Sequence, residues 1–142
     1  MLLVRRLLAQ ELIWANERYG EIHFVPSTAE DFIVVAEVDG EKVGLGRLVP
    51  VDANSAELGG IYVLPQYRGQ QVARALVNFL LRESNHRRLY CVPFVHLDGF
   101  YREFGFVPAP SDSKVPDSIA RKLQWCHRQY ASNVTLLVRN AD

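Results

Sequence analysis

The sequence has few of the residues through which small proteins are held together covalently or by metals. Cys91 and Cys126 are its only cysteines, and neither a CxxC motif nor a Cys/His cluster accompanies them. A disulfide framework and a structural zinc site are therefore not indicated. We expect no metal, and a reducing cytoplasm as the compartment.

The chain also lacks an excess of charge and a long apolar run. Lysine plus arginine number 16, and so do aspartate plus glutamate, which leaves no overall field to attract nucleic acid or an anionic membrane. No stretch approaches the ~18 apolar residues of a membrane span. The apolar opening at residues 1–9 is interrupted by Arg5 and Arg6, which favours a first helix over a targeting peptide. We expect a soluble protein with a small-molecule partner.

The chain does have enough apolar residues for one core. At 142 residues and 49% hydrophobic content, it fits a single domain over 1–142 with a two-layer core. One functional site is the expectation.

Hydrophobic periodicity predicts a mixture of helices and strands. Leu8, Leu12, Ala15 and Tyr19 recur at helical spacing and predict an amphipathic helix over about residues 2–19. Further predicted strands are 32–38, 42–51, 56–64, 88–92 and 134–138, and further predicted helices run from Gly69 to about Glu83, over 94–104, and from Pro116 to about Tyr130. This order indicates a mixed α/β fold with helices packed on the faces of a sheet.

The adjacent glycines Gly59 and Gly60 lie inside a predicted strand, where glycine packs nothing and adds backbone freedom. Two interpretations are open. Either a ligand approaches the backbone closely there, or the strand bends.

The most informative segment is Leu64–Ala73, which joins the end of a strand to the start of a long helix through a turn at Gly69. The first turn of a helix has backbone N–H groups without partners, and the helix dipole adds partial positive charge. A diphosphate can bind at such a turn without a lysine cluster, and Arg68 would add attraction.

This segment resembles the signature of the GNAT superfamily of N-acetyltransferases, which is Gln or Arg, two residues, Gly, one residue, then Gly or Ala. Gln66 and Gly69 match, whereas Gln71 departs from the small residue that the family prefers. The segment Phe100–Val107 also resembles the family's aromatic stretch ending in Gly-Phe. The resemblance covers about residues 30–108, and the strand with which the family usually begins is predicted to be absent or shortened.

The resemblance implies a GNAT-like mixed, mostly antiparallel central sheet with helices on both faces and a V-shaped split between the two central parallel strands. It also implies that acetyl-CoA lies in this split. The backbone there would pair with the pantetheine arm and polarise the acetyl carbonyl. The residues implied in cofactor binding are Ile61, Tyr62, Val63, Gln66, Arg68, Gly69, Gln70, Gln71, Val72 and Ala73.

For the chemistry, Tyr101 matches the family tyrosine that protonates the departing CoA thiolate; the alternative is an aromatic residue that only packs. Glu57 lies where some members place the base that deprotonates the amine, directly or through water, or it is a solvated charge at the strand end. His96 is a weaker base candidate, better explained as a satisfied histidine. Arg87 and Arg88 form a solvated edge or reach the 3'-phosphate of the cofactor.

The resulting hypothesis is an N-acetyltransferase that moves an acetyl group from acetyl-CoA to a primary amine of a small molecule or peptide, by direct attack in a ternary complex. The alternative is a non-catalytic acyl-CoA-binding or partner-binding module on the same fold. A phosphate-loop nucleotide hydrolase is disfavoured because the Gly-Lys-Ser/Thr ending is missing. The acceptor stays open, as does a two-fold dimer through the aromatic last helix and the final strand.

Overall fold

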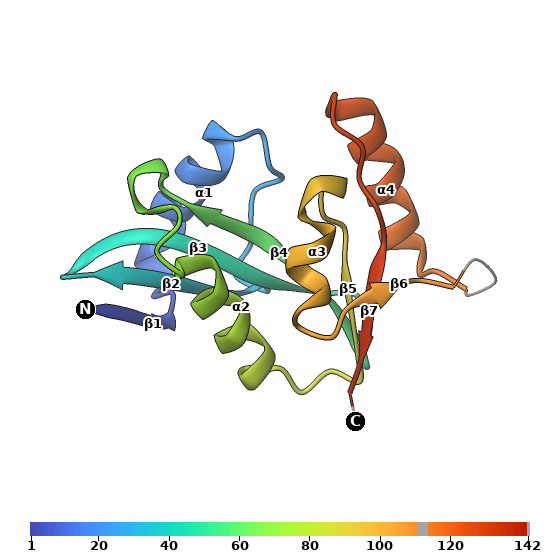
Figure 1. The fold of residues 1–142 in the computed structure, drawn as a ribbon, viewed down its shortest axis with the longest axis horizontal. Coiled ribbons are helices and arrows are strands. Elements are labelled where there is room, and N and C mark those ends of the chain that lie inside the picture. Colours follow the sequence, from blue (N-terminus) through green and yellow to red (C-terminus); the bar gives the residue numbers. More distant parts are fainter. Residues whose placement is uncertain (111–113, 142) are drawn as a thin grey trace. The chain divides into compact units, whose positions relative to one another are not determined.

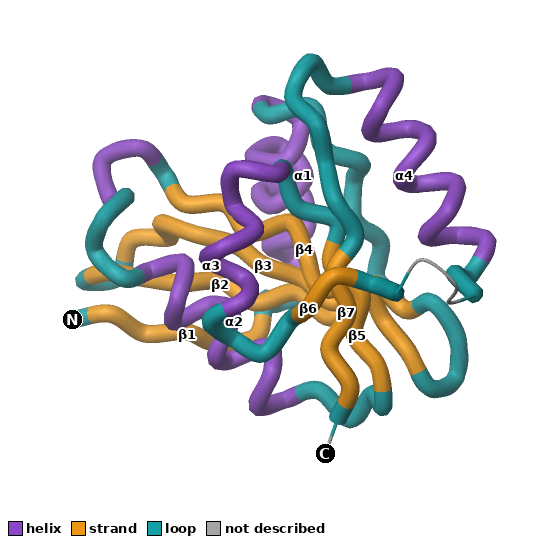
Figure 2. Tube along the Cα trace, turned by 45° about the vertical axis from the view of Figure 1, so that its right-hand side comes forward, coloured by secondary structure: helices purple, strands orange, loops and turns teal. Residues whose placement is uncertain are grey.

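The computed structural model describes residues 1–110 and 114–141. Its strands are arranged in one mixed, mostly antiparallel seven-stranded sheet with the order β1-β2-β3-β4-β5-β7-β6 (Figures 1 and 2). The predicted fold class is confirmed. The chain divides into two compact units, which are described separately: the first comprises Met1–Val49 and Gly60–Ser84, and the second comprises Pro50–Gly59 and Asn85–Asp142.

The first unit contains three antiparallel strands and two α-helices. Their bounds are β1 Leu2–Arg6, α1 Leu12–Glu21, β2 Phe32–Val38, β3 Glu41–Pro50 and α2 Val72–Glu83, with short 3-10 turns η1 at Ala9–Glu11 and η2 at Pro65–Tyr67. The strand β4, Ser55–Val63, gives its second half to this unit. The predicted hairpin around Asp39 and Gly40 is present, with β2 antiparallel to β3.

The prediction of one helix over residues 2–19 is wrong for its first half. Residues 2–6 form an edge strand in which Val4 pairs with Ala36 and Arg6 with Val34. A first strand is therefore present, which excludes the expectation that it is absent and leaves the expectation of a shortened strand. Arg5 explains why residues 2–6 form a strand and not a helix. Its guanidinium donates to Glu37 of β2 and to Glu11 of η1, and these contacts hold the strand in place. Such contacts override local helix propensity.

The two helices of the first unit cover opposite faces of its strands. Alternation along β2 directs Ile33 and Val35 toward Ala15 and Tyr19 of α1, and Val34 to the other face. On that other face a Cβ at Gly46 would lie 3.1 Å from a methyl group of Leu80 in α2 and 2.8 Å from one of Ile61. Glycine is thus required in β3 for close packing of α2.

The second unit is built on the first half of β4, on three further strands and on two helices. Their bounds are β5 Arg88–Cys91, α3 Asp98–Arg102, β6 Val107–Pro108, α4 Asp117–Gln129 and β7 Leu137–Asn140, with a 3-10 turn η3 at Val95–Leu97. The parallel pairing of β4 with β5 covers Ser55–Glu57 against Arg88–Tyr90. The core of this unit is formed by Tyr90, Ile119 and Val138, with partly buried aliphatic residues around them.

Element boundaries in the second unit differ modestly from those predicted. The helix expected over 94–104 is a 3-10 turn followed by α3, and the last strand begins at Leu137, whereas Val134 makes only an isolated bridge to Phe94. Pro116 is the N-cap of α4 and Asp117 its first residue. The strand β6 was not predicted, because Val107 and Pro108 form a pair too short to show a period.

Candidate functional site

In the first unit, the segment Leu64–Ala73 forms the expected connection from strand to helix. After β4 the chain makes the turn η2, passes through Gly69 and enters α2 at Val72. Gly69 has φ +80° and Gln71 has φ +67°, so two residues of one short turn are left-handed. No atom lies within 4 Å of a Cβ built on Gly69, so glycine is favoured there by conformation and not by space.

The N-terminus of α2 is left open by its N-cap residue. Gln71 makes no side-chain capping hydrogen bond, although the N-cap position ordinarily satisfies an N–H of the first turn. Gln70 Nε2 instead donates to the carbonyl of Gln66 at 3.2 Å, which closes the turn on itself. Arg68 is anchored through Nε to the carbonyl of Val63 at 3.2 Å. A left-handed turn that leads into a helix N-terminus is the kind of backbone arrangement that binds anions.

The conformation of Gly60 in β4 bears on whether a ligand approaches the strand at the two glycines or the strand bends there. It has φ +61°, and a Cβ there would lie 2.6 Å from Tyr19 Oη and 2.9 Å from Arg47 Nε. Protein atoms therefore approach its backbone, and the positive φ marks a local bend of the strand. At Gly59 a Cβ would meet only Glu57 Oε2, at 3.5 Å, which is ordinary contact.

A buried polar cluster lies beside Gly60 in the same unit. Tyr19 donates its hydroxyl to the Gly60 carbonyl at 2.8 Å, and burial raises the pKa of Tyr19, so the phenol stays neutral. Arg47, only 6% exposed, stacks on the Tyr19 ring at 4.3 Å from its centroid. Its Nη1 donates to Ser27 Oγ at 2.5 Å.

In the second unit, Glu57 is a buried member of an ion pair. It is 5% exposed, and Lys122 of α4 donates its Nζ to Glu57 Oε2. Glu57 is therefore not a solvated charge at the strand end, which was one of the two interpretations. The ammonium compensates a carboxylate whose burial would otherwise be costly.

Both thiols are close enough to this ion pair to be influenced by it. Burial raises the pKa of Cys91 well above its usual range, and the charge of Glu57 raises it further. Burial also raises the pKa of Cys126, with Lys122 acting in the opposite direction. Both side chains are protonated at neutral pH, so neither is an activated nucleophile.

Tyr101 lies in α3 with its ring in an apolar setting. It is 5% exposed and makes edge-to-face contacts with Phe100 and Phe106, at centroid distances of 5.0 and 6.1 Å. Its neighbour Asp98 accepts a hydrogen bond from Arg102 one turn later. His96 is exposed and stacks on Phe94 at 6.0 Å, as expected for a surface histidine.

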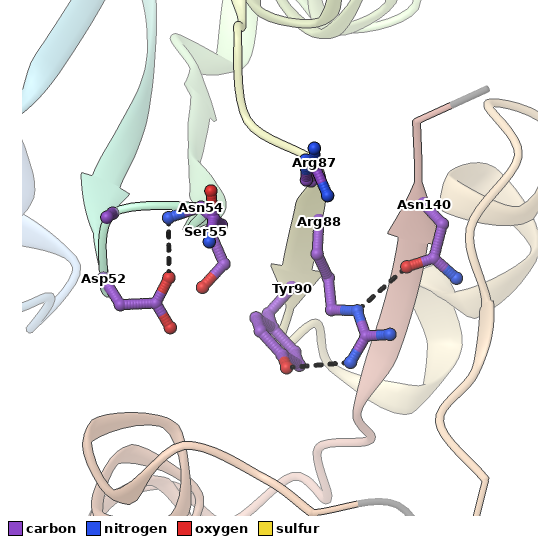
Figure 3. Close-up of a pocket in the computed structure, with 8 residues that line it drawn as sticks. Asp52, Asn54, Ser55, Arg87, Arg88, Tyr90 and Asn140 are labelled. Atoms are coloured by element: carbon purple, nitrogen blue, oxygen red, sulfur yellow. Dashed lines mark hydrogen bonds between the residues drawn. The ribbon is translucent and has the colours of Figure 1, made fainter.

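Arg87 and Arg88 line a polar cavity of about 370 Å³ in the second unit (Figure 3). Arg88 donates through Nε to Asn140 Oδ1 at 2.8 Å, and Figure 3 shows its guanidinium between Asn140 and Tyr90. The cavity also holds Asp52, whose pKa is lowered chiefly by the backbone N–H of Asn54. One carboxylate and two arginines thus line the same cavity, whose charge is mixed.

Two absences apply to the described part of the chain. Across residues 1–110 and 114–141, no helix combines the length and apolar content that a membrane span requires. Over the same residues, no group of three or more His, Cys, Asp or Glu side chains is arranged to hold a metal ion.

Comparison with known protein families identifies the family to which this fold belongs. Residues 29–108, more than half of the chain, match the family model described as an acetyltransferase (GNAT) domain. The chain belongs to the GNAT acetyltransferase family. The family-level expectation of an acyltransferase that uses acetyl-CoA is thereby supported, and the segment from Leu64 to Ala73 lies inside the matched region.

Solved structures with the same fold include several GNAT proteins with CoA bound. A Mycobacterium tuberculosis protein in complex with CoA and NLQ is 17% identical with a TM-score of 0.74, covering 99% of each chain. An Elizabethkingia anophelis GNAT family acetyltransferase with acetyl-CoA bound is 14% identical, with a TM-score of 0.70 and coverage of 99% of this chain and 98% of that one.

N-acetylglutamate synthase from Neisseria gonorrhoeae, complexed with CoA and N-acetyl-glutamate, is 18% identical with a TM-score of 0.72. The match covers 100% of the present chain and 35% of that enzyme, so the chain spans about a third of its length. At these identities the likeness establishes the fold.

Sequence reasoning missed three polar residues: Ser27 and Arg47, which the fold buries, and Lys122, which it pairs with a buried carboxylate. Lys122 gave no signal, because a lysine on an amphipathic helix is usually solvated. Ser27 lies in a loop and was not considered. Arg47 could have been found from the sequence pattern, because along β3 it lies on the same alternating face as the buried residues Val43 and Leu45. A charged residue on an apolar face is informative.

Proposed function

We propose that this protein transfers the acetyl group of acetyl-CoA to a primary amine in a ternary complex. The observation that carries the proposal is the turn before α2, where the left-handed residues Gly69 and Gln71 precede an uncapped helix N-terminus inside a GNAT domain. The CoA-bound relatives agree with acetyl-CoA as the donor.

In the proposed site, the backbone of the turn and of the first residues of α2 holds the cofactor diphosphate. Arg68 contributes its Nη groups, which have no partner among the described residues because only Nε is bonded. Ile61, Tyr62 and Val63 pair with the pantetheine arm, and their backbone N–H groups polarise the acetyl carbonyl. The remaining contacts of the diphosphate come from Gln66, Gly69, Gln70, Gln71, Val72 and Ala73.

In the proposed reaction, the neutral amine attacks the acetyl carbonyl carbon and forms the C–N bond as the C–S bond breaks. Tyr101 donates its proton to the departing thiolate. Glu57 accepts the amine proton through an ordered water. Its carboxylate is buried and paired with Lys122, which holds the Glu57 side chain in one position.

The experiment is a calorimetric titration of the protein with acetyl-CoA, with desulfo-CoA and adenosine diphosphate as matched partial ligands. The proposal predicts that acetyl-CoA and desulfo-CoA bind with similar affinity, because neither the diphosphate contacts nor the pantetheine contacts require the sulfur. Adenosine diphosphate alone should bind at least about 10-fold more weakly, because the arm is missing. Absence of acetyl-CoA binding at millimolar concentration would refute the proposed cofactor site.

A further inference from the structure

The strongest unexplained feature of the first unit is Arg47, a buried cation without a counter-ion. Among the described residues, no carboxylate lies within 4.0 Å of its guanidinium, and Arg47 is only 6% exposed. Its contacts are one hydrogen bond to Ser27 and the face of the Tyr19 ring. Both are neutral groups.

This arrangement is unfavourable in the isolated protein. A buried charge is normally paired, because its desolvation carries a free-energy cost that a neutral hydroxyl and a ring face offset only in part. Arginine carries several N–H donors in a rigid planar fork that fits a carboxylate in two-point contact. Ser27 accepts a hydrogen bond from one of these donors, Nη1.

The surroundings hold the guanidinium of Arg47 in place. Asn16 fixes Ser27 through two hydrogen bonds, because its Nδ2 donates to the Ser27 carbonyl at 3.0 Å and its Oδ1 accepts from the Ser27 N–H at 2.7 Å. Arg47 Nε faces Gly60, where any Cβ would lie 2.9 Å from that nitrogen. Glycine at position 60 therefore allows the Nε edge of Arg47 to lie close against the backbone of β4.

We propose that Arg47 binds a carboxylate of the acceptor, so that the substrate amine belongs to an amino acid. The inference rests on the proposed acetyl transfer and specifies its substrate class. Gly60 directly precedes Ile61, Tyr62 and Val63, the residues proposed to hold the acetyl group. Those residues lie roughly 3 to 10 Å along the strand from Gly60. An amino group carried near the carboxylate can reach that position.

The first test uses the unmodified protein and needs no enzymatic turnover. Calorimetry compares the N-acetyl derivatives of the common L-amino acids with the corresponding N-acetyl amino acid amides, in the absence of CoA. The amide is matched in size and lacks only the negative charge, and it also represents a peptide N-terminus. At least one acid should bind about 100-fold more tightly than its amide, as expected for loss of a charged two-point contact in a desolvated site.

The second test locates that preference with variants. Arg47→Gln should remove the difference between acid and amide, and Arg47→Lys should retain part of it because the charge stays while the fork is lost. Arg6→Gln is the matched control, since Arg6 also stacks on a ring of the first unit, Phe32, at 5.0 Å. The control should keep the full acid preference.

The outcomes separate this inference from the proposed function. Equal binding of acids and amides, no binding of any acid, or an acid preference that survives in Arg47→Gln would overturn the carboxylate site. Acetyl transfer to amines could still be observed in each of those cases. Conversely, an Arg47-dependent acid preference in a protein that does not bind acetyl-CoA would sustain the carboxylate site and refute the acetyltransferase proposal.

Discussion

Arg47 and Glu57 are the charged residues that the described part of the chain buries, and the two units treat them differently. In the second unit, Glu57 is compensated by Lys122 from the same unit. In the first unit, Arg47 has only Ser27 and the Tyr19 ring. The buried charge of the first unit thus lacks a counter-ion among the described residues, whereas the buried charge of the second unit is compensated by Lys122.

Changes at the residues of the first unit that are proposed to bind ligands should abolish ligand binding and leave the fold intact. Gly69→Glu is the strongest case, since it places a carboxylate in the turn proposed to hold the diphosphate. The affinity for acetyl-CoA should fall about 1000-fold or more through charge repulsion. Calorimetry measures this loss. The melting temperature should fall by only a few degrees, because no atom occupies the space of the new side chain and the left-handed backbone is the only source of strain.

Gly69→Ala is the control for that variant, because it imposes the same strain of a left-handed residue, about 1 kcal/mol, without charge. It should retain cofactor binding. A Gly69→Glu protein with wild-type affinity would place the diphosphate elsewhere.

Tyr101 of the second unit tests whether a buried residue there has a chemical role. Tyr101→Phe removes one hydroxyl and keeps the ring contacts with Phe100 and Phe106. Loss of a general acid should lower kcat about 100-fold with unchanged acetyl-CoA affinity. Steady-state kinetics with a fixed amine measures it, and an unaffected kcat would remove Tyr101 from the mechanism.

Lys122→Met probes the compensated charge. Removal of one partner leaves Glu57 buried and unpaired, so the free energy of unfolding should fall by about 2 kcal/mol, less than for a fully buried pair because Lys122 is 31% exposed. Urea denaturation measures the loss. The double variant Lys122→Met with Glu57→Gln should recover more than half of it, and equal losses in the single and double variants would show that the pair is not coupled.

Arg47→Met makes the opposite prediction. Replacing an uncompensated buried cation by an apolar side chain of similar length should raise the free energy of unfolding by about 1 kcal/mol, after allowance for the lost hydrogen bond to Ser27. Thermal and urea denaturation check it in ligand-free protein. A loss of 2 kcal/mol or more would mean that Arg47 is satisfied by the fold and would remove the contrast between the units.

The smallest expected effect concerns the ion pair of Arg5 and Glu11, in which the first unit does compensate a charge. Arg5 lowers the pKa of Glu11 from 4.5 to about 2 through a direct hydrogen bond. A depressed carboxyl pKa contributes stability that is complete above about pH 4.5 and is lost as the pH falls toward 2. Glu11→Gln should therefore cost about 0.5 kcal/mol at pH 7. The difference from wild type should vanish near pH 2 in urea titrations, and a constant difference would exclude the ion pair as its cause.

Much of the fold was predictable because its strands and helices carry local signals. The hairpin around Asp39 and Gly40 combines β-branched strands with a turn dipeptide, and the turn at Gly69 marks a change of period from 2 to 3.6. The first strand was not predictable. Leu2 and Leu3 lie on an exposed edge, and Arg5 holds that edge through Glu37, a contact over 32 residues.

The candidate site could be predicted only where a motif of neighbouring residues defines it. Gln66, Gly69 and Gln71 lie together in the sequence, so the signature was visible. The left-handed backbone of Gln71 was not, because glutamine has no preference for it. The partner of Glu57 is 65 residues away and the hydroxyl bonded to Arg47 is 20 residues away. Pairs of this kind depend on tertiary structure.

The measurement that tests the central claim most directly is acetyl transfer itself. Purified protein is incubated with acetyl-CoA and a panel of free amino acids, their amides and simple amines, and both the released CoA thiol and the N-acetyl product are quantified. Acetyl transfer to an amine predicts thiol and N-acetyl product in equal amounts for at least one acceptor. Binding of acetyl-CoA with no acetylated product from any amine in the panel would contradict the claim and favour a non-catalytic acyl-CoA-binding module.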